Sequence, residues 1–231
     1  MQLQTLDTVL GWICSILVIS LSIPQLLKLL KDKKTGNISF TSFWVFHIGI
    51  LLWVMYGALH PSNLWTVVLA DGISLFVNGL MTILLYHYKT EFSKKQKMYG
   101  YLGVIVTFVI GIIFIVICLA AKNVRIPDSG ASIFSAIAPG LTTLAFTPQL
   151  WMSLKTNNWK GISIYMFLLY VINNIFWIVL WIVKIKIDLF ESKSIVNLII
   201  SLTWQSISLT LFSIQFGFTL NDKLKSKKQS I

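Results

Sequence analysis

Charged residues are scarce in this chain. Only 12% of its 231 residues are Asp, Glu, Lys or Arg, whereas 56% are hydrophobic and the mean hydropathy is +0.78. Water-soluble domains interrupt their apolar segments with charge far more often than this chain does. The composition therefore excludes a soluble globular protein and indicates a polytopic membrane protein.

The chain is also poor in residues that carry chemistry. It has two cysteines, Cys14 and Cys118, and neither has a neighbour at metal-ligand spacing, so we interpret both as small apolar packing residues. The sequence contains no HExxH motif, no Ser/His/Asp set, no phosphate-binding glycine loop and no haem motif. We therefore expect a protein that is not an enzyme and that uses neither a metal nor a cofactor.

Apolar runs long enough to cross a bilayer follow one another along the sequence. A membrane-spanning helix needs about 20 predominantly apolar residues. Seven runs meet this requirement: Thr8–Leu30, Phe40–Leu59, Leu64–Tyr88, Tyr99–Ala121, Ile133–Leu154, Ile164–Val183 and Ile195–Leu220. No Lys or Arg precedes the first run, which is also too long for a cleaved secretion signal, so we expect it to stay in the mature protein. The sequence predicts an all-α membrane protein with seven transmembrane helices.

The net charge of +11 is concentrated in the connections between these spans. Fourteen of the 19 basic residues follow spans one, three, five and seven, whereas five follow spans four and six. Because positively charged loops face the cytosol, we predict an outside amino terminus and a cytosolic carboxyl terminus in a bacterial plasma membrane. The lipid bilayer accounts for the basic residues, and we expect no nucleic-acid partner.

The sequence contains an internal duplication with an offset of 124 residues. A register without gaps, from Pro24 to Trp53, gives ten identities in 30 positions. Apolar helices share Leu and Ile by chance, but Pro, Gln, Lys, Ser and Trp in one frame indicate a true repeat. The identical pairs are Pro24/Pro148, Gln25/Gln149, Leu26/Leu150, Leu30/Leu154, Lys31/Lys155, Ile38/Ile162, Ser39/Ser163, Phe43/Phe167, Ile48/Ile172 and Trp53/Trp177.

Each copy of the repeat carries a Pro-Gln pair near the end of its first span. The four residues are Pro24, Gln25, Pro148 and Gln149. Proline removes a backbone donor and clashes with the carbonyl four residues earlier, here those of Ser20 and Leu144, so each span should bend. The freed carbonyl needs a partner or a wet cavity, which the neighbouring Gln amide could supply. We predict hinges at these four residues.

The duplication divides the chain into two triple spans with one span between them. We expect a first three-helix repeat over residues 1–92, a linker helix over 93–130, and a second three-helix repeat with a basic cytosolic tail over 131–231. Since the linker reverses the chain once more, both repeats cross the membrane in the same direction, related by an axis along the membrane normal. The substrate cavity is expected at the interface between them.

Polar and aromatic residues deep in the spans are candidates for this cavity. Trp53 and Trp177 each lie about 13 residues from the cytosolic side, which at about 1.5 Å per residue places them near mid-membrane. Their rings could form a stacking wall for a ligand. Asn173 and Asn174 place two amides at similar depth, where an amide needs a partner helix, a water or a substrate.

Asp71 is the strongest single candidate. It lies in the third span, whereas the other seven acids can all lie outside the hydrocarbon. A charged acid at that depth costs a few kcal/mol, so we expect Asp71 to face the interior and to be protonated part of the time, either for function or for a bond to another helix. Allowing a two-residue insertion, the second repeat offers Asn197 at this position. His47 in span two could pass a proton to Asp71 or be a bonded packing residue.

The duplicated Pro-Gln helices in a 3+1+3 plan resemble the PQ-loop superfamily, which includes the SWEET sugar transporters and the half-size SemiSWEET proteins. The resemblance implies two three-helix bundles, packed in the order one, three, two, around one central substrate site. It also implies a substrate wall of second-helix Trp and third-helix Asn, which here corresponds to Trp53 with Asp71 and Trp177 with Asn197. Plant SWEETs carry further prolines in the second and sixth helices, and this chain has none there.

These observations favour a carrier that moves a small polar solute, a sugar first, by alternating access between the two bundles. Because the expected amide is Asp71, a proton-coupled amino-acid or other small-metabolite transporter is the alternative. A cargo receptor with the same fold is a third reading, although the lysines of the C-terminal tail are misplaced for a dilysine retrieval signal. Two repeats in one chain need no partner, but a homo-oligomer is compatible with this plan.

Overall fold

The computed structural model describes residues 2–60, 64–121, 123–159, 161–192 and 195–228. Within these ranges the secondary structure is entirely helical. The elements are α1 (Gln2–Ser20), α2 (Ile23–Asp32), α3 (Phe40–Leu59), α4 (Trp65–Tyr88), α5 (Lys94–Ala120), α6 (Asp128–Leu144), α7 (Thr147–Thr156), α8 (Ile164–Phe190) and α9 (Val196–Lys228).

Both Pro-Gln spans are broken into two helices. α1 ends at Ser20 and α6 ends at Leu144, which are the residues four positions before Pro24 and Pro148. Each proline then lies in the first turn of the next helix, α2 or α7, where its missing N–H would have no partner anyway. The predicted break in each span is confirmed, at the carbonyl that the proline ring would otherwise meet.

Six helical segments of the described chain are long and apolar enough to cross a membrane, with α1 and α2 counted together. The remaining predicted span, Ile133–Leu154, is divided between α6 and α7, which have 17 and 10 residues, so neither reaches the length of a crossing by itself. The break that Pro148 causes in the fifth span thus accounts for the difference between six long segments and seven crossings.

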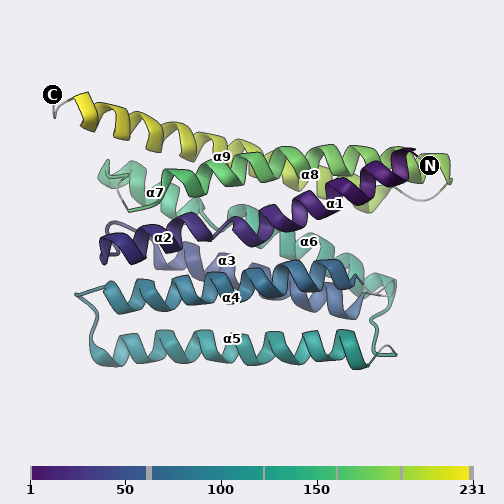
Figure 1. Cartoon of the computed structure of the whole chain (residues 1–231), viewed down its shortest axis with the longest axis horizontal. Helices are drawn as coiled ribbons and strands as arrows, with labels where there is room; N and C mark the ends of the chain where they lie inside the picture. The colour runs from purple at the N-terminus through teal and green to yellow at the C-terminus, as the bar shows by residue number, and fades with distance from the viewer. Residues whose placement is uncertain (1, 61–63, 122, 160, 193–194, 229–231) are drawn as a thin grey trace.

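The helices form two bundles of the same construction (Figure 1). In the first bundle α4 lies between α1/α2 and α3, and in the second α9 lies between α6/α7 and α8, as the order one, three, two requires. Between the bundles α1 packs on α8, and α3 packs on α6. The linker helix α5 packs on α3 and α4 and runs along the side of the first bundle. The 3+1+3 all-α architecture is therefore confirmed.

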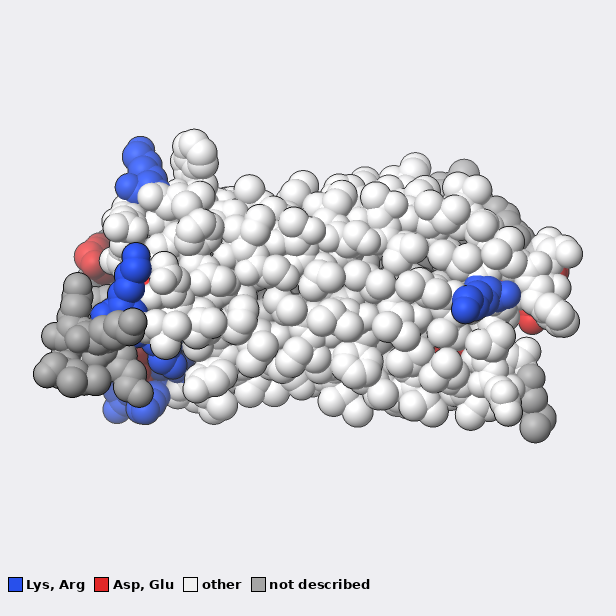
Figure 2. Space-filling view, turned by 90° about the horizontal axis from the view of Figure 1, so that it is seen from above, with Lys and Arg blue, Asp and Glu red and all other residues white. Residues whose placement is uncertain are grey.

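Basic side chains gather at one end of the molecule (Figure 2). At this end, which we call the basic end, lie α2, α7, the α4–α5 connection and the C-terminal part of α9. A smaller basic patch lies near the opposite end, and the surface between them is free of Lys and Arg in this view. An uncharged girdle between charged ends is the surface that a bilayer requires.

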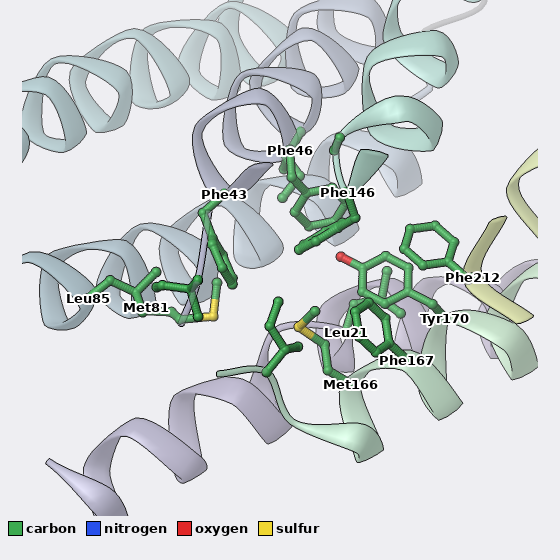
Figure 3. Packing of buried hydrophobic residues seen from close by; sticks show 14 of the residues in the cluster. Leu21, Phe43, Phe46, Met81, Leu85, Phe146, Met166, Phe167, Tyr170 and Phe212 are labelled. Carbon is green, nitrogen blue, oxygen red and sulfur yellow. The ribbon is translucent and has the colours of Figure 1, made fainter. Parts of the chain in front are cut away.

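The largest buried cluster lies toward the basic end, where both bundles contribute aromatic rings (Figure 3). We call the following residues the aromatic cluster: Phe43, Phe46, Phe146, Phe167, Tyr170 and Phe212. Phe146 lies at the break between α6 and α7 and contacts the other five rings, which come from α3, α8 and α9. Tyr170 and Phe212 stack with a centroid distance of 4.2 Å. The cluster fills the space between the two bundles on this side.

Candidate substrate-binding site

A cavity of about 120 Å³ lies between the two bundles, next to the aromatic cluster. Phe46, Tyr170 and Phe212 belong to both, so the cluster closes the cavity toward the basic end. Five of the six candidate substrate residues line the cavity: Trp53, Asp71, Asn173, Asn174 and Trp177. Residues from both repeats therefore meet in one space, as the sequence predicts for a site at the interface.

The duplication is visible in the cavity wall. Trp53 on α3 and Trp177 on α8 are 124 positions apart and both line the cavity. Trp177 stacks on Trp181 with a centroid distance of 5.2 Å, which makes the aromatic wall of the second repeat the larger one. The repeat therefore places equivalent aromatic side chains on both sides of one solute-sized space.

The packing of α9 identifies the counterpart of Asp71. In the first repeat, Asn78 on α4 contacts Ser22. The residue equivalent to Ser22 in the second repeat, 124 positions later, is Phe146, and Phe212 on α9 contacts it. If Phe212 corresponds to Asn78, then Gln205, seven residues earlier, corresponds to Asp71. Gln205 lines the cavity.

Asn197, the sixth candidate, lies in the first turn of α9, eight residues before Gln205. Eight helical residues correspond to about 12 Å along the axis. The Asn197 side chain lies outside the described part of the structure, so its role stays a prediction. The ring contact of Phe212 favours a longer insertion in α9 than the two residues assumed from the sequence.

The polar groups of the residues that line the cavity differ in their hydrogen bonding. Among the described residues, the structure records no hydrogen bond or ion pair for Asp71. The buried Asn173 Oδ1 and Trp181 Nε1 are also without hydrogen bonds. By contrast, Gln205 donates to Asn174 Oδ1, and Asn174 Nδ2 donates to the Tyr170 carbonyl at 2.6 Å. Unpaired buried polar atoms are unfavourable unless a solute or water fills the space.

His47 does not belong to this site. Its ring nitrogens contact Asn78 Oδ1 at 2.9 Å and Thr107 Oγ1 at 2.7 Å, and Asn78 Nδ2 donates to Ser22 Oγ at 3.0 Å. We call His47, Asn78, Thr107 and Ser22 the polar hub. It joins α3, α4 and the linker helix α5 to the break between α1 and α2. His47 is a bonded packing residue, and the idea of a proton shuttle to Asp71 finds no contact in the structure.

The glutamines of the Pro-Gln pairs bind the opposite repeat. The Oε1 of Gln25 accepts from the backbone N–H of Ser163 at 2.6 Å, and the Oε1 of Gln149 accepts from that of Ser39 at 2.6 Å. The amide nitrogen of Gln25 donates to the Gly161 carbonyl, and that of Gln149 donates to the Asn37 carbonyl, both at 3.4 Å. We call these four bonds the glutamine clamps. Neither Gln amide serves the carbonyl freed in its own span.

Each clamp completes the start of a helix in the other bundle. Ser39 and Ser163 are the N-caps of α3 and α8. In an ordinary capping box the Gln or Glu of the same helix reaches back to the N-cap N–H, as Gln96 does for Ser93 at the start of α5. In α3 and α8 the other repeat supplies that Gln. The identical Gln pair in the sequence indicates that these residues matter. It does not reveal their partners, the N–H groups of Ser39 and Ser163, which lie 110 and 138 residues away.

The two loops at the basic end also touch through backbone. Gly36 has φ +62°, and a Cβ on it would lie 3.1 Å from Gly161 Cα. A Cβ on Gly161 would lie 2.0 Å from the Asn37 carbonyl oxygen, which no side chain can tolerate. Asn37 Nδ2 also donates to Thr156 Oγ1 at 3.0 Å. The basic end is closed by backbone contact, clamps and the aromatic cluster together.

Comparison with known proteins identifies the family. The family model for the PQ loop repeat matches twice, over residues 8–66 and 130–189, which together cover more than half of the chain. The chain belongs to the PQ-loop repeat family. The matched segments contain both Pro-Gln breaks, both clamped N-caps and the two cavity tryptophans.

Two relatives are half-size proteins of this kind. The sugar transporter SemiSWEET of Leptospira biflexa is 33% identical over 86 residues, which are 37% of this chain and 95% of that protein. An uncharacterized protein of Methanocaldococcus jannaschii is 38% identical over 68 residues, 29% of this chain and 71% of that protein. Each of these relatives therefore matches a stretch about the size of one repeat.

Among solved structures, a eukaryotic SWEET transporter has the same fold. It superposes with a TM-score of 0.63 at 14% identity and covers 96% of this chain and 98% of that one. At this identity the similarity describes the fold alone, and it extends over both repeats and the linker helix. The chain is an integral membrane protein of the PQ-loop family with the SWEET architecture.

Proposed function

We propose that this protein is a carrier that moves a small polar solute, of the sugar class, by alternating access between its two three-helix repeats. One observation carries this proposal: the cavity lies between the repeats and is closed toward the basic end by matched, breakable contacts from both. The sugar class is supported by the SemiSWEET relative named as a sugar transporter. It is further supported by tryptophan rings beside amide groups in the cavity, since rings and amides can contact the faces and hydroxyls of a sugar.

Opening toward the basic end requires the two bundles to separate there. The glutamine clamps and the contact between Gly36 and Gly161 must break, and the aromatic cluster must part. The chain breaks before Pro24 and Pro148 allow α2 and α7 to move relative to α1 and α6, which is the hinge role we assign to both Pro-Gln pairs. The glutamine clamps and the loop contact lie outside the cavity, whereas the parting of Phe46, Tyr170 and Phe212 opens the cavity itself.

The units of this movement follow the repeat. We assign residues 1–92 to the first repeat, 93–130 to the linker and 131–231 to the second repeat. The positive-inside rule supports a cytosolic basic end and an outside amino terminus in the plasma membrane. Both repeats of one chain contribute to the described cavity wall, which supports transport by a single copy.

Counterflow in proteoliposomes tests the carrier function directly. Vesicles loaded with one unlabelled solute should accumulate the same labelled solute transiently, across a panel of sugars and amino acids at two pH values. Uptake of at least one sugar, abolished when the cavity is obstructed by Ile50→Trp, is the expected result. Uptake equal to that of empty vesicles for the whole panel would overturn the proposal.

Proton coupling through Asp71 is a second candidate, because Asp71 is the one acid among the residues that line the cavity. In that case Asp71→Asn should abolish the pH dependence of transport. Tyr170 is the other titratable residue in the described wall, and Tyr170→Phe serves as the control. An unchanged pH dependence in Asp71→Asn would remove Asp71 from any coupling role.

A further inference from the structure

The charge of the cavity wall is unbalanced. Among the described residues that line the cavity, Asp71 is the one acid, and none is Lys, Arg or His. The described wall therefore has no basic side chain that could neutralise the charge of Asp71. An ionised carboxylate in a space of this kind is strongly unfavourable when it has no counter-charge.

The Asp71 carboxylate presents only acceptors to the cavity. The structure records no hydrogen-bond donor for its two oxygens among the described residues. An ammonium group carries three N–H donors and no acceptor, so it matches this set. Trp53, Trp177 and Trp181 line the same cavity, and indole faces attract cations.

From these contacts, and resting on the carrier function proposed above, we propose that the preferred solute is a small hydroxylated molecule with one protonated amine and no carboxylate, such as an amino sugar or an amino alcohol. The amine binds Asp71, and the hydroxyls bind polar groups of the cavity wall. The loaded cavity is then electrically neutral.

Two other solute classes fit this cavity less well. A zwitterionic amino acid would satisfy Asp71 with its amine but would bring a carboxylate that has no cation in the described wall. A neutral sugar would leave Asp71 without a counter-charge, or would bind only when Asp71 is protonated. Discrimination should therefore follow the charge of the solute more than its size.

Competition in counterflow tests this inference with two matched pairs of solutes. Glucosamine and glucose differ by an amine in place of one hydroxyl, and ethanolamine and serine differ by one carboxylate. With labelled glucosamine and labelled glucose as tracers at pH 6.5, where amines are protonated, we expect glucosamine to compete about tenfold better than glucose or more. Ethanolamine should compete about tenfold better than serine.

A variant pair assigns this preference to Asp71. Asp71→Asn should reduce the advantage of glucosamine over glucose to less than about threefold, and adding Gln205→Asp, which restores the acid on the opposite repeat, should recover most of it. Asp188→Asn removes the same charge from α8 outside the cavity and should retain the wild-type ratio. Size-exclusion profiles identify any variant that fails to fold, and the wild-type competition tests the inference without them.

Membrane potential gives a second readout. A carrier that moves a monovalent cation alone should accumulate glucosamine about 50-fold at an inside-negative potential of 100 mV. If glucose competes as well as glucosamine, or serine as well as ethanolamine, the inference is wrong while the carrier function stands. If neither labelled tracer is taken up by counterflow, the carrier function fails and the inference falls with it.

Discussion

The two repeats share residues that close the molecule and the tryptophans of the cavity wall, but they differ at a polar position of that wall. The Pro-Gln pairs and the N-caps Ser39 and Ser163 are identical, and the two glutamines bind the N-cap N–H groups of the opposite repeat in the same way. The wall of the cavity, by contrast, has Asp71 on one side and Gln205 on the other. The comparison indicates that the duplication preserved the closing contacts and left a polar position of the cavity wall free to change.

The hinges of the two repeats are also packed differently. Around the break before Pro24 lies the polar hub, which ties Ser22 through Asn78 and His47 to the linker helix α5. The equivalent of Ser22 in the second repeat is Phe146, the centre of the aromatic cluster. We infer that the first repeat and α5 move as one body, against which the second repeat rocks.

Removing both glutamine clamps should give the largest change in how often the basic end is open. Gln25→Ala removes the partner of the Ser163 N–H, and Gln149→Ala removes the partner of the Ser39 N–H. Each loss costs about 1–2 kcal/mol, so the double variant should shift the equilibrium toward an open basic end by about 2–4 kcal/mol. A single cysteine in place of Leu21, in a background without Cys14 and Cys118, should then react with an impermeant maleimide about 30-fold faster or more.

The single clamp variants sharpen the same test. Because the bonds of Gln25 and Gln149 match in length, Gln25→Ala and Gln149→Ala should accelerate labelling by similar factors. Gln25→Glu, which retains the acceptor for the Ser163 N–H, should have a smaller effect than Gln25→Ala. Labelling that responds to one glutamine only would contradict the reciprocal closure.

A methyl group at the loop contact should have the next largest effect. Gly161→Ala would place a Cβ 2.0 Å from the Asn37 carbonyl oxygen, so the loops must separate at a cost of about 1–3 kcal/mol. The same cysteine reporter should react about 5- to 100-fold faster. Gly217→Ala, which meets nothing within 4 Å on α9, is the matched control. Equal labelling rates in the two variants would rule out a contact that holds the basic end closed.

Replacing His47 of the polar hub by the residue at the equivalent position of the second repeat should have the smallest effect, on stability only. His47→Val introduces the residue found at Val171 and removes hydrogen-bond partners from Asn78 and Thr107, at a cost of about 1–2 kcal/mol. The expected result is a lower Tm in detergent. In a double-mutant cycle with Thr107→Val, the two losses should be less than additive. Full additivity would mean that His47 and Thr107 are not coupled and that α5 is not tied to the first repeat.

Much of the fold could be predicted because the determining signals are local in sequence. The clash of Pro24 and Pro148 with the carbonyls four residues earlier correctly predicts a bend in each span, and α1 and α6 end at the residues that carry those carbonyls. The repeat offset correctly predicts that Trp53 and Trp177 lie in one cavity. These arguments need only the spacing along a helix and the identity of the two copies.

The rest depended on packing between distant segments. The partner of Gln25 is Ser163, 138 residues away, and no local pattern distinguishes this bond from one to a freed carbonyl of its own span. The sequence predicts Asn197 as the counterpart of Asp71, and this stays a prediction, whereas Gln205 lines the same cavity as Asp71. When two apolar helices share few identical residues, a sequence alignment cannot determine which positions correspond. Side-chain contacts in the structure are needed for that.

A reversible cross-link across the basic end tests the central claim most directly. Cysteines in place of Asn37 and Thr156, whose side chains hydrogen-bond at 3.0 Å across the two repeats, can be joined by a short bifunctional methanethiosulfonate reagent in the cysteine-free background. If transport requires the two repeats to part at this end, cross-linking should abolish counterflow and reductant should restore it, while single-cysteine variants treated alike keep their activity. Undiminished counterflow in the cross-linked protein would contradict alternating access between the repeats.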